Sequence, residues 1–397
     1  MAASLKLMEG KGEFVKRKLP SGEIQDICRC KWNADFAKAC IAQVHGAYLE
    51  EVIRNNGRYD KGSMPEKRRG YGIDHRCEYC YSYTNWGQVT PRVIDDVAEQ
   101  EFRDKRPEIV RIGKNVECGH PFYIPTLIPF LELCQKYGAG IIFPTKMLPF
   151  IQPGEKTQIL SDYSELNIFT DGDLTSKLKK VGGVIHYSIC ADRFESGAVS
   201  QGFTNEWRVE QARRYHEKKV NVDLTIVCDV TQSVADNERA GFYVAHALNS
   251  AKKYGLIARI LPIRIHSNKL AKSVTGLSMQ ALRNKHPSFP GFEHQNQGKW
   301  RKRGNNEIAP LVLHPDFKEL YDSGLGICGE IGEDEYCDDC NLCPSCPSRI
   351  VFPLREKPEV DYSRKVMAKD RREWRNREKR KIEKEKEKNQ MKLLFSE

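Results

Sequence analysis

The chain has 397 residues, 40% of them hydrophobic, which is enough for one large α/β core of about 250 residues with smaller attachments. No run of about 20 apolar residues occurs and the N-terminus carries no apolar signal segment, so we expect a soluble, cytoplasmic protein that does not engage a membrane. The net charge of +10 lies mainly in residues 364–388, where 13 Lys and Arg accompany 6 Asp and Glu.

Residues 1–67 are predicted to form an N-terminal extension and linker. Within it, residues 33–54 have apolar positions at helical spacing, and Asn55-Asn56-Gly57 follows with turn chemistry, so a helix is expected there. Residues 61–70 are polar and basic, which is typical of a linker.

Apolar strands alternate with helices from residue 68 to residue 265. Strands are predicted at 70–74, 109–113, 140–144, 183–189, 221–228 and 258–264, and helices at 93–103, 126–137, 173–180, 205–218 and 235–254. This alternation indicates parallel strands with crossover helices, and six units fit a partial (βα)6 barrel of the α/β class. Loops after the carboxyl ends of such strands carry the chemistry of barrel enzymes.

Three further regions follow the predicted barrel. Residues 266–327 are expected to be irregular, with a basic loop around Trp300, and residues 328–350 form a Cys-rich module. Residues 351–397 are predicted to form a charged helical tail. Two interpretations of the tail stay open, a nucleic-acid-binding segment and a solvated helix with alternating charges.

The 14 cysteines favour metal binding over disulfides in an intracellular protein. The isolated cysteines are expected to be small buried side chains, and these are Cys40, Cys134, Cys190 and Cys228. Cys77 and Cys80 directly follow the first predicted strand, at a spacing that suits zinc, an iron–sulfur cluster or a redox dithiol.

The segment from Gly72 to Tyr81 resembles the cluster loop of the radical S-adenosylmethionine (SAM) superfamily, in particular the branch similar to spore photoproduct lyase and its phage-encoded relatives. In that superfamily the loop after the first barrel strand has the pattern Cys-x-x-x-Cys-x-aromatic-Cys, which Cys77, Tyr79 and Cys80 match in part. The resemblance covers about residues 68–265. It implies a [4Fe–4S] cluster that binds SAM, an electron donor that reduces the cluster, and cleavage of SAM to a 5′-deoxyadenosyl radical.

One position departs from the superfamily pattern. The first cysteine of the motif falls at Ile73, whose side chain cannot bind iron. The alternatives for the third ligand are Asp74 or His75, a remote thiolate, or loss of the cluster. The remote candidates are Cys28, Cys30 and Cys118.

The same resemblance implies residues that contact the cofactor. Ser188 and Arg208 correspond to positions that meet the carboxylate or ribose of SAM, and Lys146 to the Thr-Lys that ends the third strand. Glu117, after the second strand, is a candidate for the amine of SAM or of a substrate. The alternatives are that Ser188 bonds to the backbone of its strand, that Arg208 lies on a solvated helix face, and that Glu117 belongs to an ordinary polar loop.

A second cysteine cluster forms the C-terminal module. Its members are Cys328, Cys337, Cys340, Cys343 and Cys346. Four of the five suffice for a zinc knuckle or a second iron–sulfur cluster, and the spacing does not choose between these metals.

The sequence therefore favours a radical-SAM-like enzyme of phage type; its substrate is not identified, and the charge of the tail and loop alone favours a nucleic acid or nucleotide. The alternative is a zinc-stabilised nucleic-acid-binding protein on a degenerate barrel, without SAM chemistry. In that case Cys77 and Cys80 bind zinc, with Cys28 and Cys30 as further candidates.

Overall fold

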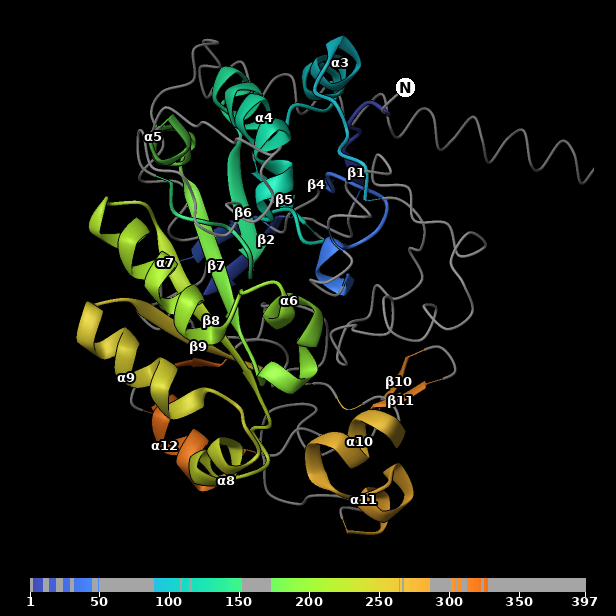
Figure 1. Cartoon of the computed structure of the whole chain (residues 1–397), viewed down its shortest axis with the longest axis vertical. Helices are drawn as coiled ribbons and strands as arrows, with labels where there is room; N and C mark the ends of the chain where they lie inside the picture. Colours follow the sequence, from blue (N-terminus) through green and yellow to red (C-terminus); the bar gives the residue numbers. More distant parts are fainter. Residues whose placement is uncertain are drawn as a thin grey trace, which may run out of the picture.

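A computed structural model describes the larger part of the chain up to residue 327. The described residues are 3–9, 14–18, 24–28, 32–44, 49, 89–107, 109–113, 116–151, 173–263, 265, 268–285, 301–303, 306–308, 313–322 and 325–327. Within them, eight strands form one sheet in the order β1-β4-β5-β6-β7-β8-β9-β12, with helices packed on it (Figure 1).

The sheet is parallel from β4 to β12, and only β1 runs antiparallel to its neighbour among these eight strands. Its strands are β1 (Met8–Glu9), β4 (Trp32–Ala34), β5 (Ile109–Ile112), β6 (Gly140–Thr145), β7 (Gly183–Ile189), β8 (Val222–Cys228), β9 (Ile257–Pro262) and β12 (Gly326–Ile327). Two separate hairpins pair β2 (Phe14–Lys18) with β3 (Ile24–Cys28), and β10 (Arg301–Arg303) with β11 (Asn306–Ile308).

The connecting helices are mostly short. They are α3 (Asp96–Lys105), α4 (Ile124–Tyr137), α5 (Asp173–Val181), α6 (Ser196–Ser200), α7 (Asn205–Glu217), α8 (Val234–Arg239), α9 (Val244–Tyr254), α10 (Asn268–Thr275), α11 (Met279–Lys285) and α12 (Pro315–Asp322). Asp95 caps α3 and Thr204 caps α7, each by accepting a backbone N–H of the first turn. Gly138 ends α4 in the left-handed conformation that glycine adopts readily.

The α/β class and the parallel sheet are confirmed, and β5 to β9 match five of the six predicted strands. Every residue of β8 is buried, as expected for a central parallel strand that is apolar along most of its length. Within the described residues the sheet has two edges, β1 and β12, so closure into a barrel stays a prediction.

The N-terminal part of the sheet differs from the prediction. The helix predicted at 33–54 is wrong over its described start, because Trp32–Ala34 is strand β4, which pairs in parallel with β5. A short 3-10 turn, η1 (Ile41–Gln43), follows. Both sides of β5 are thereby occupied, by β4 and β6, and the strand predicted at 70–74 lies outside the described residues. Strand pairing has overridden the local helical pattern.

Two further predictions are corrected. The single helix expected at 235–254 is divided into α8 and α9, because Gly241 takes φ +81° and its backbone N–H bonds the carbonyl of Glu238. Residues 266–327, expected to be irregular, contain α10, α11, α12 and β12, and β12 extends the sheet beside β9. Short elements of this kind have too few residues to show a clear periodicity.

Side chains alternate between two faces of the sheet. Tyr187 of β7 points to the side covered by α7 and lies near the buried Tyr215 of that helix. Helices α7 and α9 pack along β7, β8 and β9 on this side (Figure 1). The opposite side, which we call the opposite face, carries His186, Asp223, Thr225, Ile257, Arg259 and Leu261 by strand register.

Two buried histidines give the stability a defined pH dependence. Burial lowers the pKa of His120 from 6.5 to about 3, and burial together with Arg259 lowers the pKa of His186 to about 4. Below about pH 6.5 the unfolded chain therefore binds protons that the folded chain excludes, and the free energy of unfolding falls as the pH falls. From pH 7 to pH 5, each histidine is expected to remove about 2 kcal/mol.

Urea unfolding at pH 7 and pH 5 tests this expectation. The His186→Gln variant should lose less stability than the wild type over this interval. His246→Gln, which removes a histidine whose side chain is 67% exposed, should behave like the wild type. An equal loss in wild type and His186→Gln would contradict the assignment.

Candidate functional site

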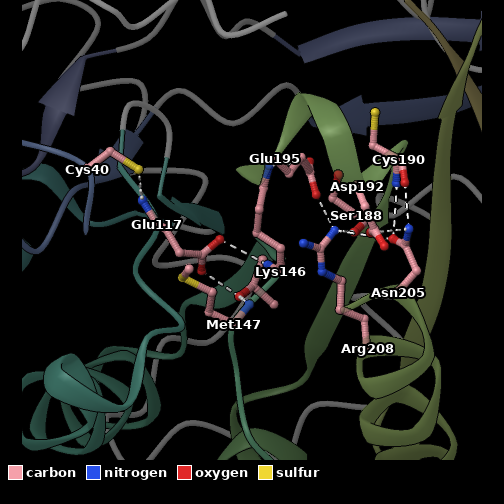
Figure 2. A network of polar contacts seen from close by, with 11 residues as sticks. Cys40, Glu117, Lys146, Met147, Ser188, Cys190, Asp192, Glu195, Asn205 and Arg208 are labelled. Carbon is pink, nitrogen blue, oxygen red and sulfur yellow. Dashed lines mark hydrogen bonds and ion pairs between the residues drawn. The ribbon is translucent and has the colours of Figure 1, made fainter. Parts of the chain in front are cut away.

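The loops that follow four neighbouring parallel strands meet at one edge of the sheet. Cys40 follows β4, Glu117 follows β5, Lys146 follows β6 and Glu195 follows β7. Figure 2 shows these side chains converging, together with Arg208 from the first turn of α7. Carboxyl ends of parallel strands are where α/β proteins place ligands and catalytic groups.

Glu117 is a buried carboxylate held by three hydrogen bonds. Oε1 accepts from the Thr145 hydroxyl at 2.6 Å and from the Gly119 N–H at 2.8 Å, and Oε2 accepts from the Lys146 N–H at 2.9 Å. Burial raises its pKa, while the bond from Thr145 and the charge of Lys146 act in the opposite direction. A Cβ on Gly119 would lie 2.0 Å from Thr145 Oγ1, so the tight turn around the carboxylate requires glycine.

The Cys40 thiol lies directly beside this turn. Its sulfur accepts the backbone N–H of Glu117 at 3.2 Å. The neighbouring Cys118 is completely buried, and its sulfur accepts the N–H of Phe36 at 3.3 Å. Burial, with the negative charge of Asp35 adding to it, raises the pKa of Cys118 well above its usual value. Cys118 is thus an unreactive structural thiol, whereas Cys40 is only partly buried at the edge of the site.

Glu195 is a carboxylate bound by two cations. Its Oε1 lies 2.6 Å from Lys146 Nζ, and its Oε2 accepts a hydrogen bond from Arg208 (Figure 2). The side chains of Glu195 and Arg208 are fully buried, and that of Lys146 is 13% exposed. Two cations therefore share the Glu195 carboxylate, and the carboxyl groups of Glu117 and Asp192 lie near enough to interact with the same cations.

Arg208 is anchored from several directions. Its NH1 donates to the backbone carbonyl of Ser188 at 2.9 Å and to Asn205 Oδ1 at 3.4 Å. Asn205 in turn donates to the Cys190 carbonyl at 2.6 Å and to Asp192 Oδ1 at 2.8 Å. These bonds fasten the loop after β7 to the start of α7, which fixes the position of Glu195.

The structure joins all four predicted cofactor residues in one region. Glu117, Lys146 and Arg208 are connected through direct bonds and Glu195, and Ser188 contributes its backbone carbonyl. Their contacts with a cofactor stay predictions. Arg208 is fully enclosed, so its described contacts are structural and hold Glu195 in place.

Two residues of the site were missed by sequence reasoning. Glu195 carries no signal beyond being a carboxylate in the loop after a strand. Cys40 was expected to be a buried apolar side chain, and this is corrected, because it is partly buried and accepts a hydrogen bond. The expectation is confirmed for Cys134, Cys190 and Cys228, each with no exposed surface.

Several predicted positions fall outside the described residues. These are Ile73, Asp74, His75, Cys77 and Cys80, Cys30, the module with Cys328, Cys337, Cys340, Cys343 and Cys346, residues 291–300 and the tail 351–397. Within the part of the chain that the structure describes, no three His, Cys, Asp or Glu side chains are grouped to hold a metal ion. In the same part, none of the helices has the length and apolar character needed to cross a bilayer.

Replacing Glu195 should expose how much the site depends on it. In Glu195→Gln the cations Lys146 and Arg208 lose their shared carboxylate, and breaking a buried ion pair typically costs about 3–5 kcal/mol. Urea unfolding should therefore show a loss of this order. The matched variant Glu217→Gln removes a 56% exposed partner of Arg213 and should lose far less. Equal losses in the two variants would contradict the described network.

No family model matches the chain, and no curated protein matches it. Solved structures with partial likeness include Streptococcus suis SuiB, bound to precursor peptide SuiA or to S-adenosylmethionine, each at 10% identity and a TM-score of 0.32. The likeness covers 47% of this chain and 36% of SuiB in the peptide complex, so the chain spans about a third of that protein. Spore photoproduct lyase, complexed with dinucleoside spore photoproduct, is 13% identical with a TM-score of 0.36, over 78% of this chain and 74% of that one. Likeness at this level does not assign the chain to a family.

Proposed function

We propose that this chain is a radical-SAM-like iron–sulfur enzyme that binds SAM at the edge of the sheet formed by the loops after β4 to β7. The observation that carries the proposal is the convergence of a thiol, a buried carboxylate and the buried ion-pair group of Lys146, Glu195 and Arg208 at this edge. The sequence adds Cys77 and Cys80 at the spacing of a cluster motif.

The donor set suits the amino acid end of SAM, which carries an ammonium and a carboxylate. Glu117 supplies a fixed carboxylate for the ammonium, and Lys146 supplies a cation for the carboxylate. Lys146 is the better candidate than Arg208 for direct contact, because Arg208 is fully buried behind Glu195. Arg208 and Glu195 then act by holding Lys146 in position.

Cys40 is proposed as the third thiolate that the motif around Cys77 and Cys80 lacks. Since β4 occupies the sheet position beside β5, the loop after β4 is the counterpart of the cluster loop, and Cys40 lies in it. In this proposal Cys40 supplies the ligand that the superfamily motif has at the position of Ile73. Cys118 is no longer a candidate for the third ligand, because its thiol is enclosed and burial raises its pKa. With cluster and SAM bound, the chemistry supplied is reductive cleavage of SAM, for which an electron donor is required.

In this proposal the protein's own residues hold and orient the cofactor and shield it from water. The Thr145 hydroxyl and the Gly119 and Lys146 N–H groups fix Glu117, and the Cys40 sulfur lies 3.2 Å from the Glu117 nitrogen. A thiolate at Cys40 is stabilised by that N–H. The site is therefore organised before any cofactor enters, which reduces the entropy lost on binding.

The cluster ligand assignment is tested by anaerobic reconstitution with iron and sulfide. Wild-type protein should show a reduced-cluster electron paramagnetic resonance signal that changes when SAM is added, and Cys40→Ala should lose both. Cys134→Ala, which alters a buried thiol inside α4, should retain them. A SAM-sensitive signal of full intensity in Cys40→Ala would contradict the third-ligand assignment.

The zinc-protein alternative predicts a different outcome in the same preparation. Colourless protein with stoichiometric zinc and no iron would overturn the enzyme proposal. With iron present, dithionite and SAM should yield 5′-deoxyadenosine, whether or not the substrate is known.

We further propose that the basic tail binds nucleic acid. Deletion of residues 364–397, which removes about seven net positive charges, should weaken binding to a single-stranded oligonucleotide and flatten the dependence of log K on log salt. Binding by the truncated protein with an unchanged salt slope would assign the tail another role. A melting curve equal to that of the full chain serves as the folding control.

A further inference from the structure

Pairs of consecutive lysines lie at the carboxyl ends of three helices, α5, α7 and α9. Each pair shortly precedes one of the strands β7, β8 and β9, which are consecutive in the sheet and parallel. The pairs therefore lie next to one another along the amino edge of the sheet, opposite the edge that carries the candidate site. We call the six residues the basic rim, and they are Lys179, Lys180, Lys218, Lys219, Lys252 and Lys253.

Backbone and side-chain contacts hold the parts of the basic rim together. The carbonyl of Asn221 accepts the N–H of Ile185 at 3.0 Å, which joins the turn after α7 to β7. A Cβ on Gly255 would lie 3.9 Å from His216 Nε2, so the carboxyl ends of α7 and α9 are in contact. Figure 1 shows these two helices side by side. Because packed helices lie about 10 Å apart, three helix ends extend the basic rim over about 20 Å.

All six lysines of the basic rim are exposed. Among the described residues, none of the six forms an ion pair with a carboxylate. The acidic side chains nearest in sequence are already bound to other cations, since Glu210 and Glu217 pair with Arg213, and Glu132 pairs with Lys177. The basic rim thus presents ammonium groups whose charge the described part of the protein does not pair.

Stabilisation of helix ends does not account for the whole pattern. One cation in the last turn is enough to interact with a helix dipole, yet each helix has two. Lys219 also takes φ +63°, a left-handed conformation that glycine adopts without strain, as Gly138 and Gly255 do after α4 and α9. The other non-glycine residue with positive φ in the described part is Arg106, a cation that ends α3 at the same edge. Two cations therefore occupy positions that local folding alone would give to glycine.

We propose that the basic rim is a docking surface for the phosphate backbone of double-stranded nucleic acid. A duplex carries one negative charge per about 1.7 Å of its axis, so about 20 Å of duplex presents about 12 phosphates to the six lysines. Lysine ammonium groups on flexible stems bind phosphates without reading bases, so the binding is independent of sequence. The basic rim lies away from the candidate site, so it anchors nucleic acid and goes beyond the proposed enzyme activity.

The test measures binding of full-length protein to a fluorescein-labelled duplex of about 30 base pairs by fluorescence anisotropy at several salt concentrations. The triple variant Lys179→Gln, Lys218→Gln and Lys252→Gln removes one lysine of each pair and leaves one cation at each helix end. At low salt it should bind at least tenfold more weakly than the wild type. The slope of log K against log salt should become shallower by about 2 to 3, because each phosphate contact contributes about 0.9.

A matched triple variant separates the position of the charges from their number. Lys6→Gln, Lys38→Gln and Lys272→Gln together remove three exposed lysines elsewhere, and this protein should keep the affinity and salt slope of the wild type. A second duplex of unrelated sequence should bind the wild type equally well. Lys219→Gly should weaken binding several-fold without lowering the melting temperature, because glycine relieves the strained backbone at this position. Melting curves confirm that each variant is folded.

Three results would overturn the inference. The first is unchanged affinity and salt slope in the triple variant of the basic rim. The second is an equal loss in both triple variants, which would assign the binding to net charge alone. The third is tighter binding of the wild type to vesicles with anionic lipid than to the duplex, lost in the triple variant, which would make the surface a membrane contact. The Cys40 experiment is independent of these results, since it follows the iron signal at the other edge of the sheet.

Discussion

The backbone ladder that joins β4, β5, β6 and β7 in parallel is the constraint on which the rest of the molecule depends. Because the four strands run in the same direction, the loops after them all emerge at one edge. Cys40, Glu117, Lys146 and Glu195 are therefore linked by a series of direct contacts, although they are far apart in the sequence. The ladder thus converts residues of different loops into one site.

Two cations at that edge are accommodated because they share one buried carboxylate. One carboxylate, Glu195, accepts both Lys146 and Arg208, and the loop after β7 is tied to α7 by Asn205. A buried ion pair of this type contributes specificity of position more than stability, because desolvation offsets much of the attraction. On the opposite face of the sheet, the buried Asp223 carboxylate likewise interacts with His186 and Arg259.

Much of the fold could be predicted from the sequence, since β5 to β9 and α3, α4, α5 and α7 show clear periodicity or apolar runs. The start of the sheet could not, because Trp32–Ala34 becomes a strand only through pairing with β5. Lys146, Ser188 and Arg208 were predicted through resemblance and Glu117 from its place after a strand, and all four lie at this edge, whereas Cys40 was missed because a lone cysteine has no pattern. Glu195 was missed because the contacts that define it arise from tertiary packing.

The place of β4 in the sheet also has an entropic consequence for the proposed cluster. A contiguous motif separates its first two cysteines by three residues, whereas 36 residues separate Cys40 from Cys77. Because the cost of closing a flexible loop grows only with the logarithm of its length, this twelvefold increase amounts to about 2 kcal/mol. Metal–thiolate binding supplies on the order of 10 kcal/mol, so a divided motif is thermodynamically tolerable. An insertion of this size can therefore enter a cluster loop without abolishing its ligand set.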